Sequence, residues 1–308
     1  MGVWIDTDMG FDDIAAILVV RHAGLDIDGV SLVFGNAPLE QVRANAAGAA
    51  AAFGWRFPIH TGRASSVLGE RTTAAYALGE TGIPTAGKSL PEGTPLPESD
   101  AFDALSRWIG ETTSPRRVLA LGPLTNIAAL ALARPELAGR IDELVWMGGA
   151  VGRGNHTASA EFNAAADPEA AAIVLAHHIP VKMVDLDLCR KIEASPADVI
   201  PIRAAGGRNA GLLADMLEGF IDIATSRGRP AMALYDPAAA FAFVEPAAVG
   251  FQPAGIAVEL NGALTRGRTV VETRGSHATF NACYAVEVDV KRARSAILGA
   301  LIEEARRP

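Results

Sequence analysis

The first fifteen residues crowd four carboxylates into one short corner between two apolar segments. An apolar run at residues 3–5 stops at Asp6, and apolar residues resume on a helical period over residues 14–20. This pattern predicts a buried strand, a tight turn and a helix. The acids of the corner are Asp6, Asp8, Asp12 and Asp13. Their mutual repulsion opposes ionisation unless a cation or hydrogen-bond donors compensate for it.

A bound metal ion accounts for these acids better than helix capping does. Oxygen ligands without a neighbouring Cys or His favour Ca²⁺ or Mg²⁺ over zinc. In a purely structural interpretation, Asp12 and Asp13 cap the helix and complement its dipole. That interpretation leaves Asp6 and Asp8 unexplained, and we therefore favour a metal site.

Strand-like and helix-like segments alternate along the first 185 residues. The sequence predicts further strands at 27–34, 58–60, 118–121, 144–147 and 181–184, and helices at 39–53, 100–113, 122–134 and from Asp167 and Pro168 onward. Beyond them we expect helices at 196–204, 210–226, 235–244 and 291–306, and closing strands at 249–260, 269–273 and 284–289. The alternation predicts one α/β domain over residues 1–308, with a mostly parallel central sheet flanked by helices.

The candidate site residues stand at the carboxyl ends of predicted strands. They are the acidic corner, Asn36, Leu121, the segment after Met147 and the loop near Asp185. Ligands bind outside the carboxyl ends of the strands in such sheets, so we expect these segments to meet at one rim. The proline- and glycine-rich stretch 79–99 is interpreted as a surface loop near this site. The glycines at 148–154 lack the dinucleotide-binding spacing and are interpreted as a flexible connection.

Composition narrows the classes of partner. The chain of 308 residues is half hydrophobic and carries a net charge of −8 without a sustained basic run, which argues against nucleic-acid binding. Its two cysteines, Cys189 and Cys283, have no metal-ligand or disulfide spacing. No apolar run reaches the roughly 20 residues that span a bilayer, and no secretory signal precedes the first strand. We therefore expect a cytoplasmic protein that binds a small molecule and no membrane.

The acidic motif Asp6-Thr-Asp8-Met-Gly10-Phe-Asp12-Asp13 resembles the signature of the inosine-uridine-preferring nucleoside hydrolase family. Shorter motifs continue the resemblance in the family's order over nearly the whole chain. They are Gly35-Asn36, Gly122-Pro-Leu-Thr-Asn126, Met147-Gly-Gly, Gly154-Asn155, Ala160-Glu161-Phe-Asn163, Asp167-Pro-Glu-Ala170 and Asp236-Pro237. The resemblance implies a Rossmann-like core and a homo-oligomer, either a dimer or a tetramer.

The resemblance also implies a set of site residues. It places Ca²⁺ on Asp8, Asp13, Asp236 and the main-chain carbonyl of Leu121, although Asp236 alone reads as a helix N-cap before Pro237. The residues that would hold the ribose are Asp12, Asn155, Glu161 and Asn163, with Met147 beneath the sugar and Asn36 near it. Asp6 would support the loop or orient the ligands.

The reaction implied is hydrolysis of the N-glycosidic bond of a ribonucleoside to free base and ribose. Ca²⁺ would lower the pKa of its water, and Asp8 would accept the proton as the water attacks the anomeric carbon. The ribose would become cation-like, and the surrounding carboxylates would stabilise that charge.

Two positions depart from the family's pattern at the leaving-group end. Leu78 and Tyr235 stand where many members have histidines. Tyr235 is interpreted as a hydrogen-bond donor to the base or a stacking partner, with packing beside Asp236 as the alternative, because an ordinary phenol is a poor acid near neutral pH. The sequence leaves open which base is preferred and which group assists its departure.

Two other functions fit parts of the sequence. A phosphatase of the haloacid-dehalogenase type also begins with Asp-x-Asp after a strand, but Gly10 and the Asp12-Asp13 pair do not match that family. A ribose- or nucleoside-binding protein that has lost turnover is the non-enzymatic alternative, favoured by the replacements at Leu78 and Tyr235.

Overall fold

A nine-stranded sheet runs through the computed structural model, which describes residues 2–308. Its strand order is β10-β9-β11-β6-β5-β4-β1-β2-β3. Neighbouring strands from β11 to β3 are parallel, and β9 is antiparallel to both β10 and β11. The strands of this sheet are β1 (Gly2–Thr7), β2 (Asp26–Leu32), β3 (Ile59–Thr61), β4 (Arg117–Ala120), β5 (Glu143–Met147), β6 (Val181–Val184), β9 (Val249–Val258), β10 (Thr269–Glu272) and β11 (Ala282–Val288). A separate antiparallel pair joins β7 (Glu193–Ala194) to β8 (Met232–Ala233).

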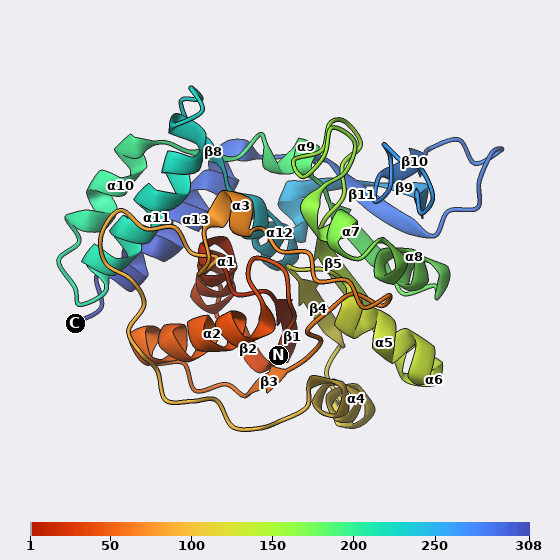
Figure 1. Cartoon of the computed structure of the whole chain (residues 1–308), viewed down its shortest axis with the longest axis horizontal. Coiled ribbons are helices and arrows are strands. Elements are labelled where there is room, and N and C mark those ends of the chain that lie inside the picture. Colours follow the sequence, from red (N-terminus) through yellow and green to blue (C-terminus); the bar gives the residue numbers. More distant parts are fainter. Residues whose placement is uncertain (1) are drawn as a thin grey trace.

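Helices cover both faces of the sheet, with α10 and α11 at one end of the molecule and β9 and β10 toward the other (Figure 1). The helices are α1 (Phe11–His22), α2 (Leu39–Phe53), α3 (Ala75–Leu78), α4 (Ala101–Glu111), α5 (Thr125–Ala133), α6 (Pro135–Ala138), α7 (Phe162–Ala166), α8 (Pro168–Ala176), α9 (Leu186–Cys189), α10 (Pro196–Arg203), α11 (Ala210–Thr225), α12 (Tyr235–Val244), α13 (Val290–Ala305) and the 3₁₀ turn η1 (Pro246–Ala248). Within residues 2–308, no helix is both long and apolar enough to cross a bilayer.

The central strands are apolar on both faces because each face packs against helices. In β1, Ile5 belongs to the core shared with α1, α2, α11, α12 and α13, whereas Trp4 belongs to the core shared with α4, α5 and α8. In β5, Val145 and Trp146 divide between the two cores in the same way. Burial on both faces explains why these strands read as continuous hydrophobic runs rather than as alternating patterns.

The structure confirms the predicted single α/β domain with a mostly parallel sheet flanked by helices. The acidic corner forms as expected, with β1 ending at Thr7 and α1 beginning at Phe11. The predicted domain limits of 1–308 stay a prediction, and Met1 lies outside the described residues. Seven short elements, α3, α6, α7, α9, β7, β8 and η1, were not predicted because segments of two to five residues carry little periodicity.

Most of the stretch 79–99 lies away from the site, contrary to expectation. Its middle packs on α11, where the Lys88 amide donates to Asp215 Oδ2 at 2.7 Å, and its end joins β3, where Thr61 donates to the Ser99 carbonyl at 2.8 Å. Only its beginning approaches the acidic corner, where the Thr81 carbonyl accepts from Asn45 at 2.8 Å. The site is flanked instead by α3, which precedes this stretch.

Candidate active site

One cavity of ≈ 370 Å³ opens where the carboxyl ends of the central strands meet. It gathers residues that follow four strands of the sheet: Asp8 and Asp12 after β1, Asn36 after β2, Leu121 after β4 and Met147 at the end of β5. The predicted convergence at one rim is therefore confirmed for these four strand ends, whereas Asp185 does not line the cavity.

The corner at the floor of the cavity is shaped by local hydrogen bonds. Met9 adopts a left-handed backbone conformation with φ 45°, and the chain turns sharply after Asp8. This conformation is unfavourable in free energy for any residue other than glycine. The Met9 amide donates to Thr7 Oγ1 at 3.0 Å, and the same hydroxyl donates to Asp13 Oδ1 at 2.5 Å. The Gly10 amide donates to Asp13 Oδ2 at 2.7 Å. Asp13 thus closes the turn while its carboxylate stays fully buried.

Asn36 joins the second strand end to the acidic corner. Its amide donates to Asp8 Oδ2 at 2.7 Å, and its side-chain nitrogen donates to Asp8 Oδ1 at 2.9 Å and to Asp13 Oδ2 at 3.0 Å. Gly35 makes this approach possible, because a Cβ there would lie 2.0 Å from Asp8 Oδ2. Asn36 therefore fixes the orientation of the Asp8 and Asp13 carboxylates.

Asp236 reaches the same corner from α12. It is the second residue of that helix and not its N-cap, which is Leu234, so the capping interpretation of Asp236 is wrong. Oxygens of Asp12, Asp13 and Asp236 lie within 4.8 Å of one another. Asn36 Nδ2 bridges Asp8 and Asp13, at 2.9 and 3.0 Å, so Asp8 adjoins the same cluster. The arrangement brings four acids together without a cysteine or histidine ligand.

Burial and mutual repulsion shift the protonation of these acids. Burial raises the pKa of Asp12 to about 8, and the charge of Asp13 adds to the shift. Burial also raises the pKa of Asp8, Asp13 and Asp236 above the ordinary value, with neighbouring acids contributing at Asp8 and Asp236. Without a compensating charge the cluster holds protons near neutral pH, so its oxygen donors fit a hard divalent cation that would displace them.

Asp6 lies beneath this cluster and touches a different set of partners. Its Oδ2 accepts hydrogen bonds from the Ser31 hydroxyl and from Asn126 Nδ2, the latter at 2.7 Å, while its Oδ1 is buried without a partner among the described residues. Burial raises the pKa of Asp6 to about 7. Asp6 therefore ties β1 to β2 and to the Gly122–Asn126 motif, which agrees with the supporting role expected of it.

The side chains expected to hold ribose also organise the loops around the cavity. Asn163 donates from Nδ2 to the carbonyls of Leu121 and Met147, both at 2.9 Å, and so links the ends of β4 and β5. Glu161 caps α7 and accepts three backbone amides at 2.7–3.0 Å, and burial raises its pKa to about 7. Asn155 Oδ1 accepts from the Phe162 amide at 2.9 Å. All of them line the cavity, and their contact with ribose stays a prediction.

Leu78 and Tyr235 both line the cavity at the predicted leaving-group end. Burial raises the pKa of Tyr235, so its hydroxyl keeps its proton at neutral pH and can donate a hydrogen bond. A second phenol, Tyr76, lies on α3 and approaches His156 Nδ1 at 3.2 Å.

Sequence reasoning missed several residues that line the cavity. They are Tyr76, Phe162, Phe220, Ile223, Met232 and the arginines Arg153, Arg190, Arg227 and Arg229. Phe162 lies within the recognised motif Ala160-Glu161-Phe-Asn163 and was the most accessible to prediction. The others occur singly in separate segments, and no local spacing signals that they face a common space.

A family model for inosine-uridine preferring nucleoside hydrolases matches residues 3–295. The chain belongs to this family. It is 34% identical over 288 residues to the non-specific ribonucleoside hydrolase RihC of Salmonella paratyphi B, covering 93% of this chain and 92% of that protein. Its fold resembles a purine-preferring ribonucleoside hydrolase from Gardnerella vaginalis, with a TM-score of 0.91, 26% identity and 99% of both chains covered. A plant nucleoside hydrolase aligns with a TM-score of 0.90 and 25% identity over 98% of both chains.

Family membership makes the protein a ribonucleoside hydrolase, an enzyme that cleaves N-glycosidic bonds. The predicted resemblance is confirmed. The phosphatase alternative has no support. The matched family covers almost the whole chain, and the Asp12-Asp13 pair of this chain does not match a haloacid dehalogenase.

The raised pKa values predict that the metal-free protein loses stability as pH rises. The folded acids hold protons that the unfolded chain releases from about pH 4 upward, so this contribution to stability is full at low pH and is lost as pH rises toward about 8. A divalent cation such as Ca²⁺ would bind the deprotonated acids, so the stabilisation that it would bring should grow over the same range. Thermal unfolding with chelator and with Ca²⁺, at pH 5 and pH 8, measures both effects. A Ca²⁺-induced rise in Tm that is equal at the two pH values would contradict this account of the cluster.

Proposed function

We propose that this protein is a Ca²⁺-dependent hydrolase of ribonucleosides that releases free base and ribose. One observation carries the proposal: Asp8, Asp12 and Asp236, from two distant segments, line a cavity in a nucleoside hydrolase fold, and the buried Asp13 belongs to the same cluster. Their donor set is all oxygen, which Ca²⁺ prefers, and family membership supplies the reaction class.

The proposed Ca²⁺ ligands are Asp8, Asp13, Asp236 and the carbonyl oxygen of Leu121. The Leu121 carbonyl accepts one hydrogen bond, from Asn163, and keeps a second lone pair for a cation. Asp12 lies within the same cluster and is proposed as a ribose ligand. When bound, Ca²⁺ would acidify water at the site and order the sugar hydroxyls.

The residues of the chain then position the sugar and move one proton. Asp12, Asn155, Glu161 and Asn163 are proposed to bind the ribose hydroxyls, with Met147 beneath the ring and Asn36 beside it. A water molecule attacks the anomeric carbon, its oxygen forms the new C–O bond, and Asp8 accepts its proton. The two hydrogen bonds from Asn36 hold the Asp8 carboxylate in place for this step. The surrounding acids stabilise the cation-like ribose as the C–N bond breaks.

Tyr235 is proposed to assist the departing base, which leaves with the bonding electron pair. Its raised pKa makes full proton transfer unfavourable, so the phenol acts as a hydrogen-bond donor or a stacking surface. The base takes its proton from water.

Assembly and location belong to the same proposal. We expect a homo-oligomer, a dimer or a tetramer, in the cytoplasm. Light scattering of the purified protein measures the subunit number directly.

A panel of ribonucleosides tests the function. Purified protein should release reducing sugar and free base from at least one of inosine, adenosine, uridine and cytidine, and metal analysis of the same sample should find Ca²⁺. Binding of nucleosides by calorimetry without release of base over hours would favour the alternative of a binding protein.

Replacing Asp13 with Ala should remove metal and activity together. The substitution deletes a carboxylate that closes the turn and is a proposed Ca²⁺ ligand. We expect the metal content of the purified variant to fall to background and hydrolysis to drop below detection. Asp222→Ala, on the exposed side of α11, is the matched control and should keep both. Full metal content with normal turnover in Asp13→Ala would refute the ligand assignment.

Asp8 and Asn163 should fail differently when substituted. Asp8→Asn keeps the side-chain shape but removes the proton acceptor, so kcat should fall by about 100-fold or more. Asn163→Ala should chiefly damage kcat/KM for ribosides and reduce discrimination against 2′-deoxyribosides. Steady-state kinetics on matched ribosides and deoxyribosides separate the two outcomes. An Asn163→Ala enzyme with wild-type discrimination would remove Asn163 from the ribose site.

Tyr235→Phe should slow natural nucleosides more than an activated riboside. Inosine needs help to expel its base, whereas p-nitrophenyl riboside has an intrinsically good leaving group. We expect a loss of roughly tenfold on inosine and little change on p-nitrophenyl riboside, since one charged or developing-charge hydrogen bond is worth about that much. Tyr284→Phe, outside the cavity, is the matched control. Equal effects on both substrates would leave Tyr235 as a packing residue.

A further inference from the structure

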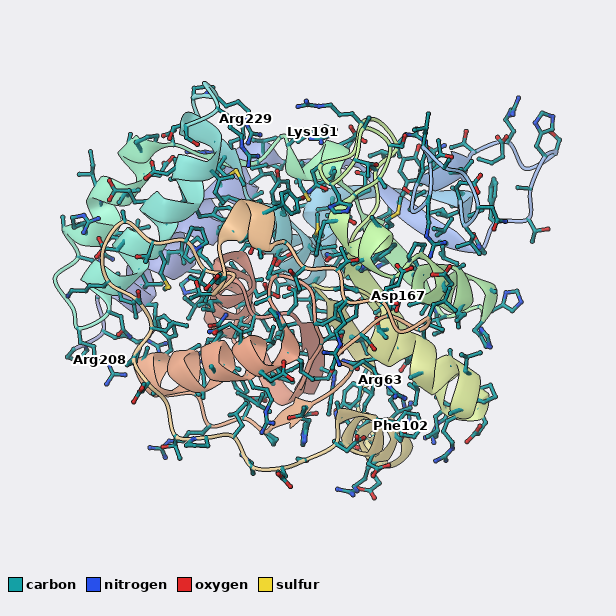
Figure 2. The ribbon with its side chains drawn as sticks, viewed as in Figure 1. Arg63, Phe102, Asp167, Lys191, Arg208 and Arg229 are labelled. Carbon is teal, nitrogen blue, oxygen red and sulfur yellow. The ribbon has the colours of Figure 1, made fainter. Side chains whose placement is uncertain are left out.

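The mouth of the active-site cavity carries four guanidinium groups. Arg153 and Arg190 come from the loop after β5 and from the end of α9, and Arg227 and Arg229 come from the connection between α11 and β8. Figure 2 shows Arg229 at the edge of the molecule where β8 and α9 lie, distant from Arg208 near the end of α2. The chain carries a net charge of −8, so this gathering of positive charge on one cavity is not a general property of its surface.

One of the four is anchored and the other three are available. Arg190 donates to the carbonyls of Arg153 at 2.8 Å and Gly154 at 3.0 Å, and lies 3.6 Å from Asp187. Within residues 2–308, Arg153, Arg227 and Arg229 have no carboxylate partner, and the guanidinium of Arg229 meets only the sulfur of Met232 at 4.0 Å. All three are exposed. Their positive charge is therefore open to a ligand entering the cavity.

The arginines do not serve as counterions for the acids at the floor. Burial, neighbouring acids and hydrogen bonds govern the pKa of those carboxyls, with no arginine among the main influences. The guanidiniums act instead on two phenols that line the cavity: Arg229 and Arg190 lower the pKa of Tyr235 against the larger effect of burial, and Arg227 does so at Tyr76. Depth separates the two sets, since the acids are buried and the free arginines are exposed.

The cavity thus combines an acidic floor with positively charged arginines around it. The acids of the floor suit a cation and a ribose that becomes positive, and the arginine rim, defined as Arg153, Arg190, Arg227 and Arg229, suits an anion. A neutral nucleoside offers no charged group to the arginine rim. If the arginines were merely solvated surface residues, they would have no reason to come from three separate segments onto the cavity that leads to the acids.

We propose that the arginine rim binds an anionic oxygen group carried by the ribonucleoside, either a 5′-phosphate or a carboxylate on the base. The proposal rests on the proposed function, because the riboside must sit on the acidic floor for its anionic group to reach the rim. Guanidinium groups pair with both phosphate and carboxylate through charge-assisted hydrogen bonds, so the chemistry of recognition is shared and the position of the anion differs.

Matched substrates distinguish a phosphate on the sugar from a carboxylate on the base. Uridine, orotidine and uridine 5′-monophosphate share one ring system and differ by a carboxylate or a phosphate, and inosine with inosine 5′-monophosphate repeats the phosphate comparison on a purine. We expect kcat/KM, or the affinity by calorimetry for a compound that is not cleaved, to be at least about tenfold better for one anionic member than for its neutral parent, since a charged hydrogen bond contributes on that order. The preferred compound identifies the source of the anion.

The double variant Arg227→Gln/Arg229→Gln tests the residues. It should lower the ratio of anionic to neutral kcat/KM, or of the corresponding affinities, by about tenfold, whereas Arg56→Gln, exposed and outside the cavity, should leave the ratio unchanged. Added salt should weaken the wild-type preference for the anionic compound and affect the neutral one little. A merely structural role of the arginines would not give this selective salt dependence.

The outcomes distinguish failure of this inference from failure of the function. Hydrolysis of inosine or uridine with no preference for any anionic analogue, and no change in the ratio in the double variant, overturns the anion site and leaves the hydrolase intact. Tighter binding of an anionic analogue, lost in the double variant, without hydrolysis of any riboside supports the anion site and overturns the proposed function.

Discussion

Repulsion among buried carboxylates is the constraint on which the rest of the site depends. Asp8, Asp12 and Asp236 line one pocket floor, and Asp13 is buried in the same cluster. Burial raises the pKa of each of these acids above its ordinary value. The fold compensates through a dense set of donors: the amide of Gly10, the hydroxyl of Thr7 and three hydrogen bonds from Asn36. In the proposed function, a divalent cation would complete the compensation, and the same charge balance would favour a ribose that becomes positive.

The parallel sheet converts short local motifs into one site. Each motif follows a strand, and Asn36, Asn126 and Asn163 cross-link the strand ends: Asn126 joins Asp6 to the β2 end, and Asn163 joins the carbonyls of Leu121 and Met147. These amides hold the backbone where acids and carbonyls must converge. Because the cross-links come from the same motifs as the site residues, the fold and the chemistry are encoded together.

The sequence predicted the acidic residues at the floor of the site but not the residues of the arginine rim. The strand-to-helix corner was predictable because an apolar run that stops at Asp6 and a helical period from residue 14 are local patterns. Convergence at the strand ends followed from the parallel topology. The positions of Tyr76, Arg227 and Arg229 depend on how α3 and the segment after α11 pack over the sheet, which no local spacing encodes. The same tertiary packing carries most of the stretch 79–99 away from the cavity, against expectation.

The most direct test of the account is a crystal structure of the protein grown with Ca²⁺ and ribose. The account predicts one cation bound by Asp8, Asp13, Asp236 and the carbonyl of Leu121, with the 2′- and 3′-hydroxyls of the sugar turned toward it and toward Asp12 and Asn163. Anomalous scattering from the ion would identify the element. A cation held elsewhere, or a ribose seated away from the acids while the four carboxylates stay protonated, would contradict the account.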